Sequence, residues 1–144
     1  MPSKAEQIAA LEIAYVEFRD LLTMLPDDWY ARPGLGDWNL SQLLSHMEGW
    51  YREVAANLGR AVPNALSNYE NEDDWNVRFI SSAQPGTAAL DAFDIGFHEF
   101  YAAIKALPES EYGDDGPGAF VLGGVGLFHF AEHRPQIEAW LAKG

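Results

Sequence analysis

Hydrophobic residues recur at intervals of three and four along most of this 144-residue chain, which is the period of an amphipathic helix. The first such stretch covers residues 3–25, where the apolar stripe consists of Ile8, Leu11, Tyr15, Phe18, Leu22 and Leu25. Pro26 follows directly, and proline has no amide hydrogen to continue a helix. We therefore expect the first helix to span residues 3–25.

Two further stretches have the same period. Residues 40–58 follow a helix-start pattern, because Asn39 can cap the first turn and Gln42 can reach back to it. Residues 87–107 form the next stretch, and Thr87 is a candidate N-cap. Both segments are predicted to be long helices with one apolar face.

A fourth long helix is expected over residues 120–142, and a short one over residues 72–80, which starts with three acidic residues. Near the start of the fourth helix stand Gly123, Gly124 and Gly126. A phosphate-binding loop would need a preceding strand and a following lysine, and neither is present. These glycines are better explained by close helix packing. The chain has no segment with the alternating pattern of a strand.

Four amphipathic helices can bury their apolar faces only against one another. The sequence thus predicts an all-α fold, a four-helix bundle with a short extra helix between the second and third long helices. Its 144 residues suffice for one hydrophobic core, so we expect a single domain over residues 1–144.

Composition narrows the range of partners. Lysine and arginine total 9 against 22 acidic residues, and the net charge of -13 would repel nucleic acid and anionic membranes. There is no cysteine, which excludes disulfides and a thiolate nucleophile from the chain itself. No apolar segment is long enough to span a bilayer and no signal peptide is evident, so we expect a soluble, cytoplasmic protein that acts on a small molecule.

Two histidines stand out for their spacing. His129 and His133 are four residues apart, so on a helix both lie on one face, in the same arc as apolar Leu122, Val125 and Trp140. Two inward imidazoles at this spacing are typical of a site for a divalent metal, although a hydrogen-bonded core cluster would have the same pattern. His46, at the edge of the apolar stripe of residues 40–58, could supply a third ligand. His98 falls on a polar margin and is predicted to lie at the surface.

Several segments, in their order along the chain, carry a family resemblance: PGLGDWNLSQLLSHMEGW, EDDWNVRF, a helix ending in ALPE, and FHFAEHRPQIEAWL. The chain resembles the DinB-like superfamily, which includes the metal-binding domains of mycothiol-dependent maleylpyruvate isomerase and bacillithiol transferases. The resemblance implies a four-helix bundle with up-down-down-up helix order. It also implies that His46, His129 and His133 are metal ligands and that the chain forms a homodimer.

The sequence departs from a regular helix near one of these histidines. Pro135 follows His133 by two residues, removes the amide that would bond the carbonyl of Ala131, and clashes with that carbonyl. We expect a kink or bulge beside the site, which would disturb the placement of His133.

Three histidine ligands leave at least one coordination position open for water or substrate. The function implied by the resemblance is that of a metal-dependent thiol transferase, with zinc or nickel, or iron, as the metal and an exogenous low-molecular-weight thiol. A metal-dependent hydrolase and a non-enzymatic small-molecule binding module are the alternatives. Glu48 and Glu132 flank ligands in sequence, but neither is assigned a catalytic role. The tryptophans are expected to be core or helix-contact residues, and Trp50 alone is placed near the site.

Overall fold

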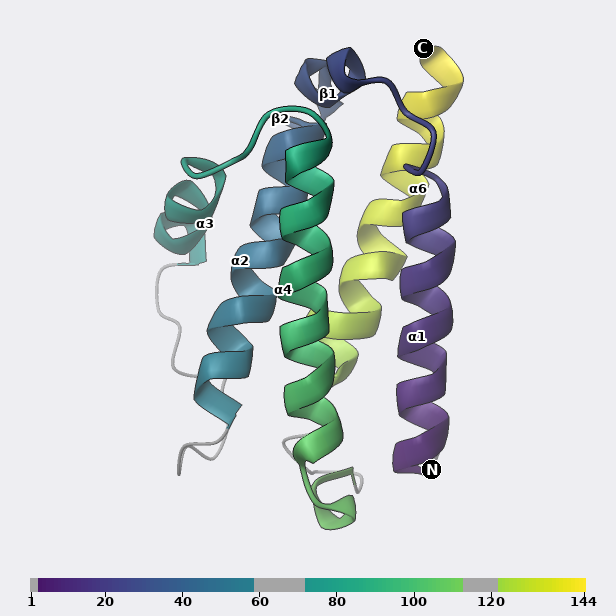
Figure 1. The fold of residues 1–144 in the computed structure, drawn as a ribbon, viewed down its shortest axis with the longest axis vertical. Coiled ribbons are helices and arrows are strands. Elements are labelled where there is room, and N and C mark those ends of the chain that lie inside the picture. The colour runs from purple at the N-terminus through teal and green to yellow at the C-terminus, as the bar shows by residue number, and fades with distance from the viewer. Residues whose placement is uncertain (1–2, 59–71, 113–121) are drawn as a thin grey trace.

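The fold is described from a computed structural model, in which residues 3–58, 72–112 and 122–144 are placed. Four long helices pack side by side: α1 (Lys4–Asp20), α2 (Leu40–Leu58), α4 (Thr87–Ala106) and α6 (Phe128–Lys143). In Figure 1, α1 rises from the N-terminus, α2 and α4 both descend, and α6 rises to the C-terminus. The predicted all-α bundle with up-down-down-up order is confirmed.

Because α2 and α4 run in the same direction, the chain between them must return along the bundle. Part of this connection is the short helix α3 (Glu72–Ile80), which lies beside α2 and outside the four-helix bundle (Figure 1). Its bounds match the predicted residues 72–80. The connection therefore places an additional helix against the outer side of α2.

The first helix is shorter than predicted. It begins with a capping box, in which the Ser3 hydroxyl accepts from the amide of Glu6 and the Glu6 carboxylate accepts from the amide of Ser3. It ends at Asp20 rather than at residue 25. After that point the hydrogen bonds change to the tighter i to i+3 kind, such as Leu22 N to Arg19 O at 3.0 Å, so the chain turns before it reaches Pro26.

The starts of α2 and α4 differ in how they are capped. At α2 the predicted capping box is present, since the Gln42 amide donates to Asn39 Oδ1 at 2.8 Å and the Asn39 amide donates to Gln42 Oε1 at 3.0 Å. At α4 the prediction of Thr87 as N-cap is wrong. Gly86 occupies the cap position with a φ of 55°, and Asp27 accepts from the Thr87 amide at 3.3 Å.

A small hairpin follows the 3-10 helix η1 (Asp27–Ala31) and was not predicted from the sequence. Strands β1 (Pro33–Leu35) and β2 (Trp38–Asn39) pair antiparallel, and the turn between them includes Gly36 at a φ of 62°. The hairpin is held on the last helix, where the Trp140 indole donates to the Pro33 carbonyl at 3.1 Å. Only two residue pairs make the sheet, too few for an alternating pattern.

The last helix begins with a widened turn. The π-helix η3 (Leu122–Leu127) leads directly into α6, whereas residues 120–121 of the predicted helix lie outside the described part. Of the kink or bulge predicted beside Pro135, the bulge is not found, because α6 continues as an α-helix through Pro135 to Lys143 and the widened turn precedes the histidine pair. One lost hydrogen bond is tolerated within a sixteen-residue helix that is packed on the bundle.

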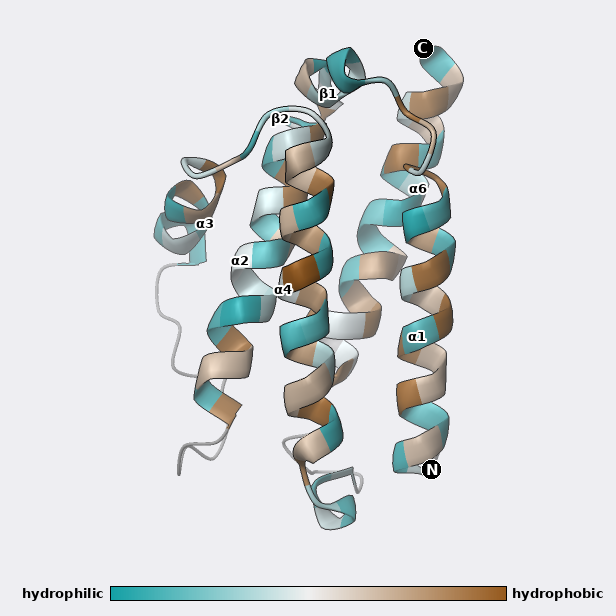
Figure 2. Cartoon of the chain, in the orientation of Figure 1, coloured by the Kyte–Doolittle hydropathy of each residue, from teal (hydrophilic) through white to brown (hydrophobic). Residues whose placement is uncertain are grey.

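The interior is rich in aromatic residues contributed by all four long helices. Buried rings stack and cross near the middle of the bundle, namely Phe18, Tyr51, Phe93, Phe97, Phe100 and Phe130. Figure 2 shows hydrophobic and hydrophilic residues alternating along each long helix, as expected for amphipathic helices. Among the described residues, no helix is both long and apolar enough to cross a membrane.

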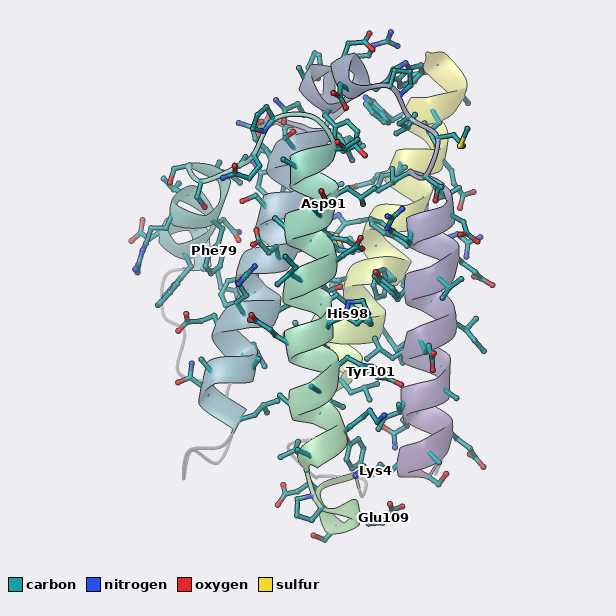
Figure 3. The ribbon with its side chains drawn as sticks, viewed as in Figure 1. Lys4, Phe79, Asp91, His98, Tyr101 and Glu109 are labelled. Atoms are coloured by element: carbon teal, nitrogen blue, oxygen red, sulfur yellow. The ribbon has the colours of Figure 1, made fainter. Side chains whose placement is uncertain are left out.

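The lower end of the bundle is closed by contacts with α1. The Lys4 ammonium donates to the carbonyls of Lys105 and Leu107, at 2.7 Å each, at the C-terminus of α4. Next to it, the 3-10 helix η2 (Glu109–Tyr112) places Glu109 beside Lys4 (Figure 3). A cation at a helix C-terminus interacts favourably with the helix dipole, so this contact ties α1 to α4.

Candidate metal centre

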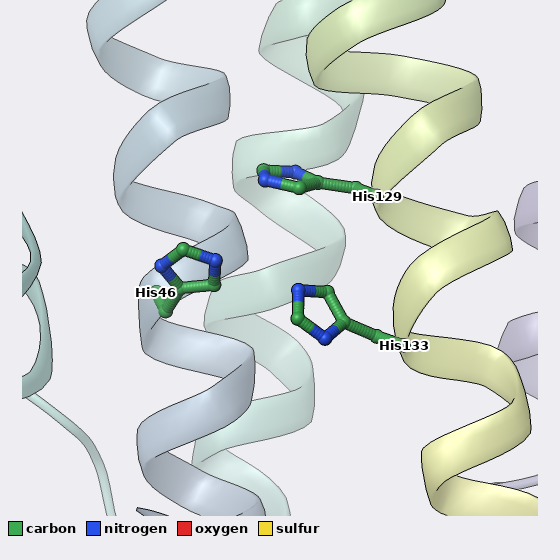
Figure 4. Close-up of side chains that lie close together, drawn as sticks. All are labelled: His46, His129 and His133. Carbon is green, nitrogen blue, oxygen red and sulfur yellow. The ribbon is translucent and has the colours of Figure 1, made fainter. Parts of the chain in front are cut away.

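Three of the four histidines meet in the interior between α2 and α6. His46 comes from α2, and His129 and His133 come from successive turns of α6 (Figure 4). The centroid of the His46 ring lies 5.2 Å from the centroid of the His129 ring and 5.4 Å from that of the His133 ring. The centroids of the two α6 rings are 5.6 Å apart. One nitrogen from each ring lies within 4.8 Å of the others, so the three form a group that can hold a metal ion.

All three rings are buried, and burial determines the charge of His46 and His129. Their exposed fractions are 8% for His46, 9% for His129 and 5% for His133. Burial lowers the pKa of His46 to about 4, against the opposing effect of its hydrogen bond to Asn76, and His133 lowers it further. Burial, followed by the proximity of His46 and His133, holds the pKa of His129 well below its usual value. Both imidazoles are therefore neutral near pH 7, which is the form that binds metals.

His46 is held by a residue of α3. Its Nδ1 is 2.9 Å from Asn76 Oδ1, and the Trp50 indole donates to the same oxygen at 2.8 Å. An indole nitrogen can only donate, so the shared Asn76 atom must be the carbonyl oxygen. That oxygen in turn requires a proton on His46 Nδ1, which leaves Nε2 with its lone pair. Figure 4 shows one nitrogen of the His46 ring on the side of α6, in position to face the other two histidines.

His133 has the same arrangement on α6. Its Nδ1 is 2.9 Å from Gln136 Oε1, one turn along the helix, so this nitrogen donates and Nε2 carries the lone pair. His133 Nε2 is buried and has no hydrogen-bond partner among the described residues, and the same holds for Nδ1 of His129. A buried imidazole nitrogen without a partner is costly. A divalent metal bound by the three rings would satisfy His133 Nε2, and the donor set fits such an ion.

The histidines open onto a cavity of about 580 Å³. The hairpin and α3 cover one side of it, and the start of α6 covers the other. Besides the histidines, its lining consists of Leu35, Gly36, Asp37, Trp38, Trp50, Glu72, Asn76, Val125, Phe128, Glu132 and Gln136. Within the described ranges this lining has three carboxylates and several aromatic rings, but neither lysine nor arginine. The volume is sufficient for a small organic molecule beside a metal.

The two acidic residues next to ligands in sequence have different positions. Glu132 lines the cavity, and its carboxylate is 3.9 Å from His133 Nε2. Glu48 instead bonds Arg52 at 2.8 Å and packs against Gly96 of α4, where its side chain would collide with any added Cβ. Of the two, Glu132 alone lies where it could take part in chemistry at the cavity.

His98 is exposed on α4, as predicted (Figure 3). Its ring lies 5.6 Å from that of Tyr15 on α1, and its Nδ1 is 2.6 Å from the Asp94 carbonyl. This histidine is part of the contact between α4 and α1 and lies outside the three-histidine group.

Sequence reasoning missed several residues of the site. Trp38, expected only as a core or helix-contact residue, stands 4.8 Å from the ring of His46 and lines the cavity together with Trp50. Asn76 and Gln136 were also missed. The signal for Gln136 was available, because it follows His133 by three residues on the same helix. Asn76 has no such signal, since its contact depends on where α3 docks.

Comparisons with known proteins bear on the fold alone. No family model matches the chain, and no curated protein matches it. A crystal structure of a protein from Streptococcus pneumoniae, solved by a structural genomics consortium, is similar with a TM-score of 0.79. The two chains share 14% sequence identity over 99% of this chain and 92% of that one. At this identity the likeness establishes a shared fold and carries no function.

Proposed function

We propose that this chain is a divalent-metal-dependent enzyme of the thiol-transferase type and a member of the DinB-like superfamily. The observation that carries the proposal is the group of three buried histidines, whose nitrogens lie within 4.8 Å of one another at the wall of a cavity. Closed structural sites commonly have four protein ligands, whereas three leave a position for a reactant. The resemblance of the sequence to the superfamily points to the same three residues.

His46, His129 and His133 would hold the metal, with zinc or nickel, or iron, as the expected ion. The hydrogen bonds to Asn76 and Gln136 keep His46 and His133 in the tautomer that presents Nε2. A divalent metal bound there would keep a thiol ionised at neutral pH. Because the chain has no cysteine, the thiol must come from outside.

The reaction is a substitution or addition at an electrophilic carbon. In both cases the sulfur of the exogenous thiol forms a C–S bond. In a substitution, the leaving group departs with the electron pair of the broken bond, and the thiol proton passes to solvent. In an addition, the electron pair of the broken π bond or epoxide C–O bond stays in the product, which takes up one proton in place of the one that the thiol lost. The aromatic side chains of Trp38, Trp50 and Phe128 line the cavity and would pack against the apolar part of the electrophile.

A metal-dependent hydrolase is the second candidate. It is favoured by Glu132, whose carboxylate faces the cavity 3.9 Å from His133 Nε2 and could accept a proton from water.

As a further part of the proposal, the chain forms a homodimer. Ile13 and Val16, which are 59% and 47% exposed on α1, offer apolar surface for a second copy.

The test uses zinc- or nickel-loaded protein with a simple thiol and three electrophiles: a haloarene, an epoxide and an α,β-unsaturated ketone. We expect consumption of at least one electrophile about tenfold or more above the uncatalysed rate. The H129A variant should lose this rate, and H98A, which removes a histidine outside the group, should retain it. Release of product in the absence of thiol would favour the hydrolase, and rates equal to background for all three electrophiles would contradict the enzyme proposal.

A further inference from the structure

The helix α3 contributes two polar side chains to the lining of the cavity, Glu72 and Asn76, and Asn76 is the one that contacts a histidine. Asn76 lies at the centre of a chain of contacts, since its Oδ1 accepts from Trp50 Nε1 at 2.8 Å and from His46 Nδ1 at 2.9 Å. All three side chains line the cavity. A carbonyl oxygen has two lone pairs, so both donors can be satisfied together.

The position of Asn76 depends entirely on how α3 docks against α2. None of the residues of α3 is fully buried, so the helix is held by a few specific contacts. Gly49 of α2 makes room for Phe79, because a Cβ at position 49 would lie 2.2 Å from Phe79 Cγ. Close by, the Ser45 hydroxyl donates to the Phe79 carbonyl at 2.5 Å, and the ring of Phe79 meets Trp50 at 5.3 Å.

The docked helix selects one of two forms of His46. A neutral imidazole carries its proton on either nitrogen, and only the nitrogen without the proton can bind a metal. With α3 in place, Nδ1 donates to Asn76 and Nε2 is free to bind. Without Asn76, His46 could instead carry its proton on Nε2, which would then be unable to bind a metal. The indole of Trp50 would also lose its hydrogen bond of 2.8 Å to Asn76.

We propose that Asn76 is a positioning residue which couples the docking of α3 to metal binding, by holding His46 in the Nδ1–H tautomer. This inference rests on the proposed metal site and deepens it. Docking of α3 prepares the third ligand, and by linkage a bound metal stabilises the docked helix. The helix that covers one side of the cavity is thereby tied to the occupancy of the site.

The first test needs no variant. In metal-free protein near neutral pH, nitrogen NMR shifts of His46 should report a protonated Nδ1 and an unprotonated Nε2. The opposite tautomer would overturn the proposal. Because this measurement uses metal-free protein, it is independent of whether the proposed function is correct.

The second test compares two substitutions at position 76 by competition of zinc with a chelator. N76L removes the acceptor, and we expect zinc affinity to fall about tenfold or more, the range found when partners of metal-bound histidines are removed. N76D keeps an acceptor oxygen of similar size and should retain affinity within about threefold. Equal affinity of N76L and the parent would overturn the coupling, whereas failure of the parent to bind zinc would overturn the proposed metal site itself.

The third test undocks α3 without altering any side chain that touches the histidines. G49A places a methyl group against Phe79, whereas G123A adds one that meets no neighbouring group within 4 Å among the described residues, which makes it the matched control. We expect G49A to lower zinc affinity and G123A to leave it unchanged.

Hydrogen exchange gives a fourth test. Zinc should slow the exchange of the α3 amides in the parent protein and fail to do so in N76L. Exchange of α3 that is insensitive to zinc in the parent would contradict the coupling.

Discussion

The three histidines differ in what holds them, and this decides how much of the site the sequence could predict. His129 and His133 were predicted from their four-residue spacing within an apolar arc, and both are buried in α6. His46 was placed at the edge of its apolar stripe, and the structure brings it to the other two. Asn76 was not predicted, because helical periodicity says nothing about contacts between α3 and α2.

At the residue scale, burial of neutral histidines predicts a pH dependence of folding. The pKa of His46 is about 4 in the folded chain and 6.5 in the unfolded one, so below pH 6.5 the unfolded state takes up a proton first. The free energy of unfolding of metal-free protein should therefore fall as the pH drops from 6.5 towards 4. His46 alone accounts for about 3 kcal/mol of this loss, at about 1.4 kcal/mol per pKa unit.

Denaturant unfolding at a series of pH values measures this effect. An H46Q variant removes the titrating group, so its free energy of unfolding should decline less steeply over the same range than that of the parent. Parallel pH profiles for the two proteins would contradict a neutral, buried His46.

At the element scale, the cap of a helix was predicted correctly where its partner is near in the sequence and wrongly where its partner is distant. The capping box of Asn39 and Gln42 lies within four residues and was predicted correctly. Thr87 was wrongly taken as the cap of α4, because the oxygen that accepts from its amide belongs to Asp27, sixty residues earlier in the chain. The residues around Thr87 in the sequence do not indicate a contact with a residue so far away along the chain.

Two glycines near the start of the last helix permit a matched prediction. A Cβ at Gly126 would lie 2.8 Å from Leu11 Cδ1 of α1, while one at Gly123 would meet no other part of the described structure within 4 Å. We expect G126A to destabilise the protein by about 1–3 kcal/mol, as for an overpacked core. G123A should be neutral or stabilise by up to about 1 kcal/mol, since alanine favours a helix over glycine.

Thermal or denaturant unfolding of the two variants gives the measurement. The result also tests the interpretation of these glycines as packing residues, which the structure supports for Gly126 and not for Gly123. Equal stability of G126A and G123A would show that α1 and the last helix are not in close contact at this position.

At the scale of the whole molecule, periodicity predicted the number of long helices but could not order them in space. Apolar stripes show which face of each helix is buried and leave the choice of neighbours open. The up-down-down-up order was implied by the family resemblance, and it requires a connection that runs the length of the bundle between α2 and α4. That connection contains α3, so the overall topology is what brings Asn76 to the site.

The charge of the molecule predicts which thiols it accepts. The described lining of the cavity includes Asp37, Glu72 and Glu132 and has neither lysine nor arginine, within a chain of net charge -13. A negatively charged thiol should therefore bind less well than one of similar size with a neutral or positive group. We expect 2-mercaptoethylamine and 2-mercaptoethanol to bind several-fold more tightly than 3-mercaptopropionate.

Cobalt-loaded protein allows these affinities to be measured, because a bound thiolate gives a charge-transfer absorption band. The difference between the thiols should shrink as salt is added, since the carboxylates at the cavity are exposed and salt screens them. Tighter binding of 3-mercaptopropionate at low salt would contradict the predicted selectivity.

The central claim is that His46, His129 and His133 together bind one divalent metal ion. The most direct test is isothermal titration calorimetry, in which zinc is added to the metal-free protein. The variants H46A, H129A and H133A are compared with H98A. The account predicts one zinc per chain for the parent and for H98A. In each of the other three variants it predicts affinity reduced about a hundredfold or more, because losing a direct ligand should cost at least as much as losing a residue that hydrogen-bonds to one. Zinc binding that is absent in the parent, or equally strong in H129A and H98A, would contradict it.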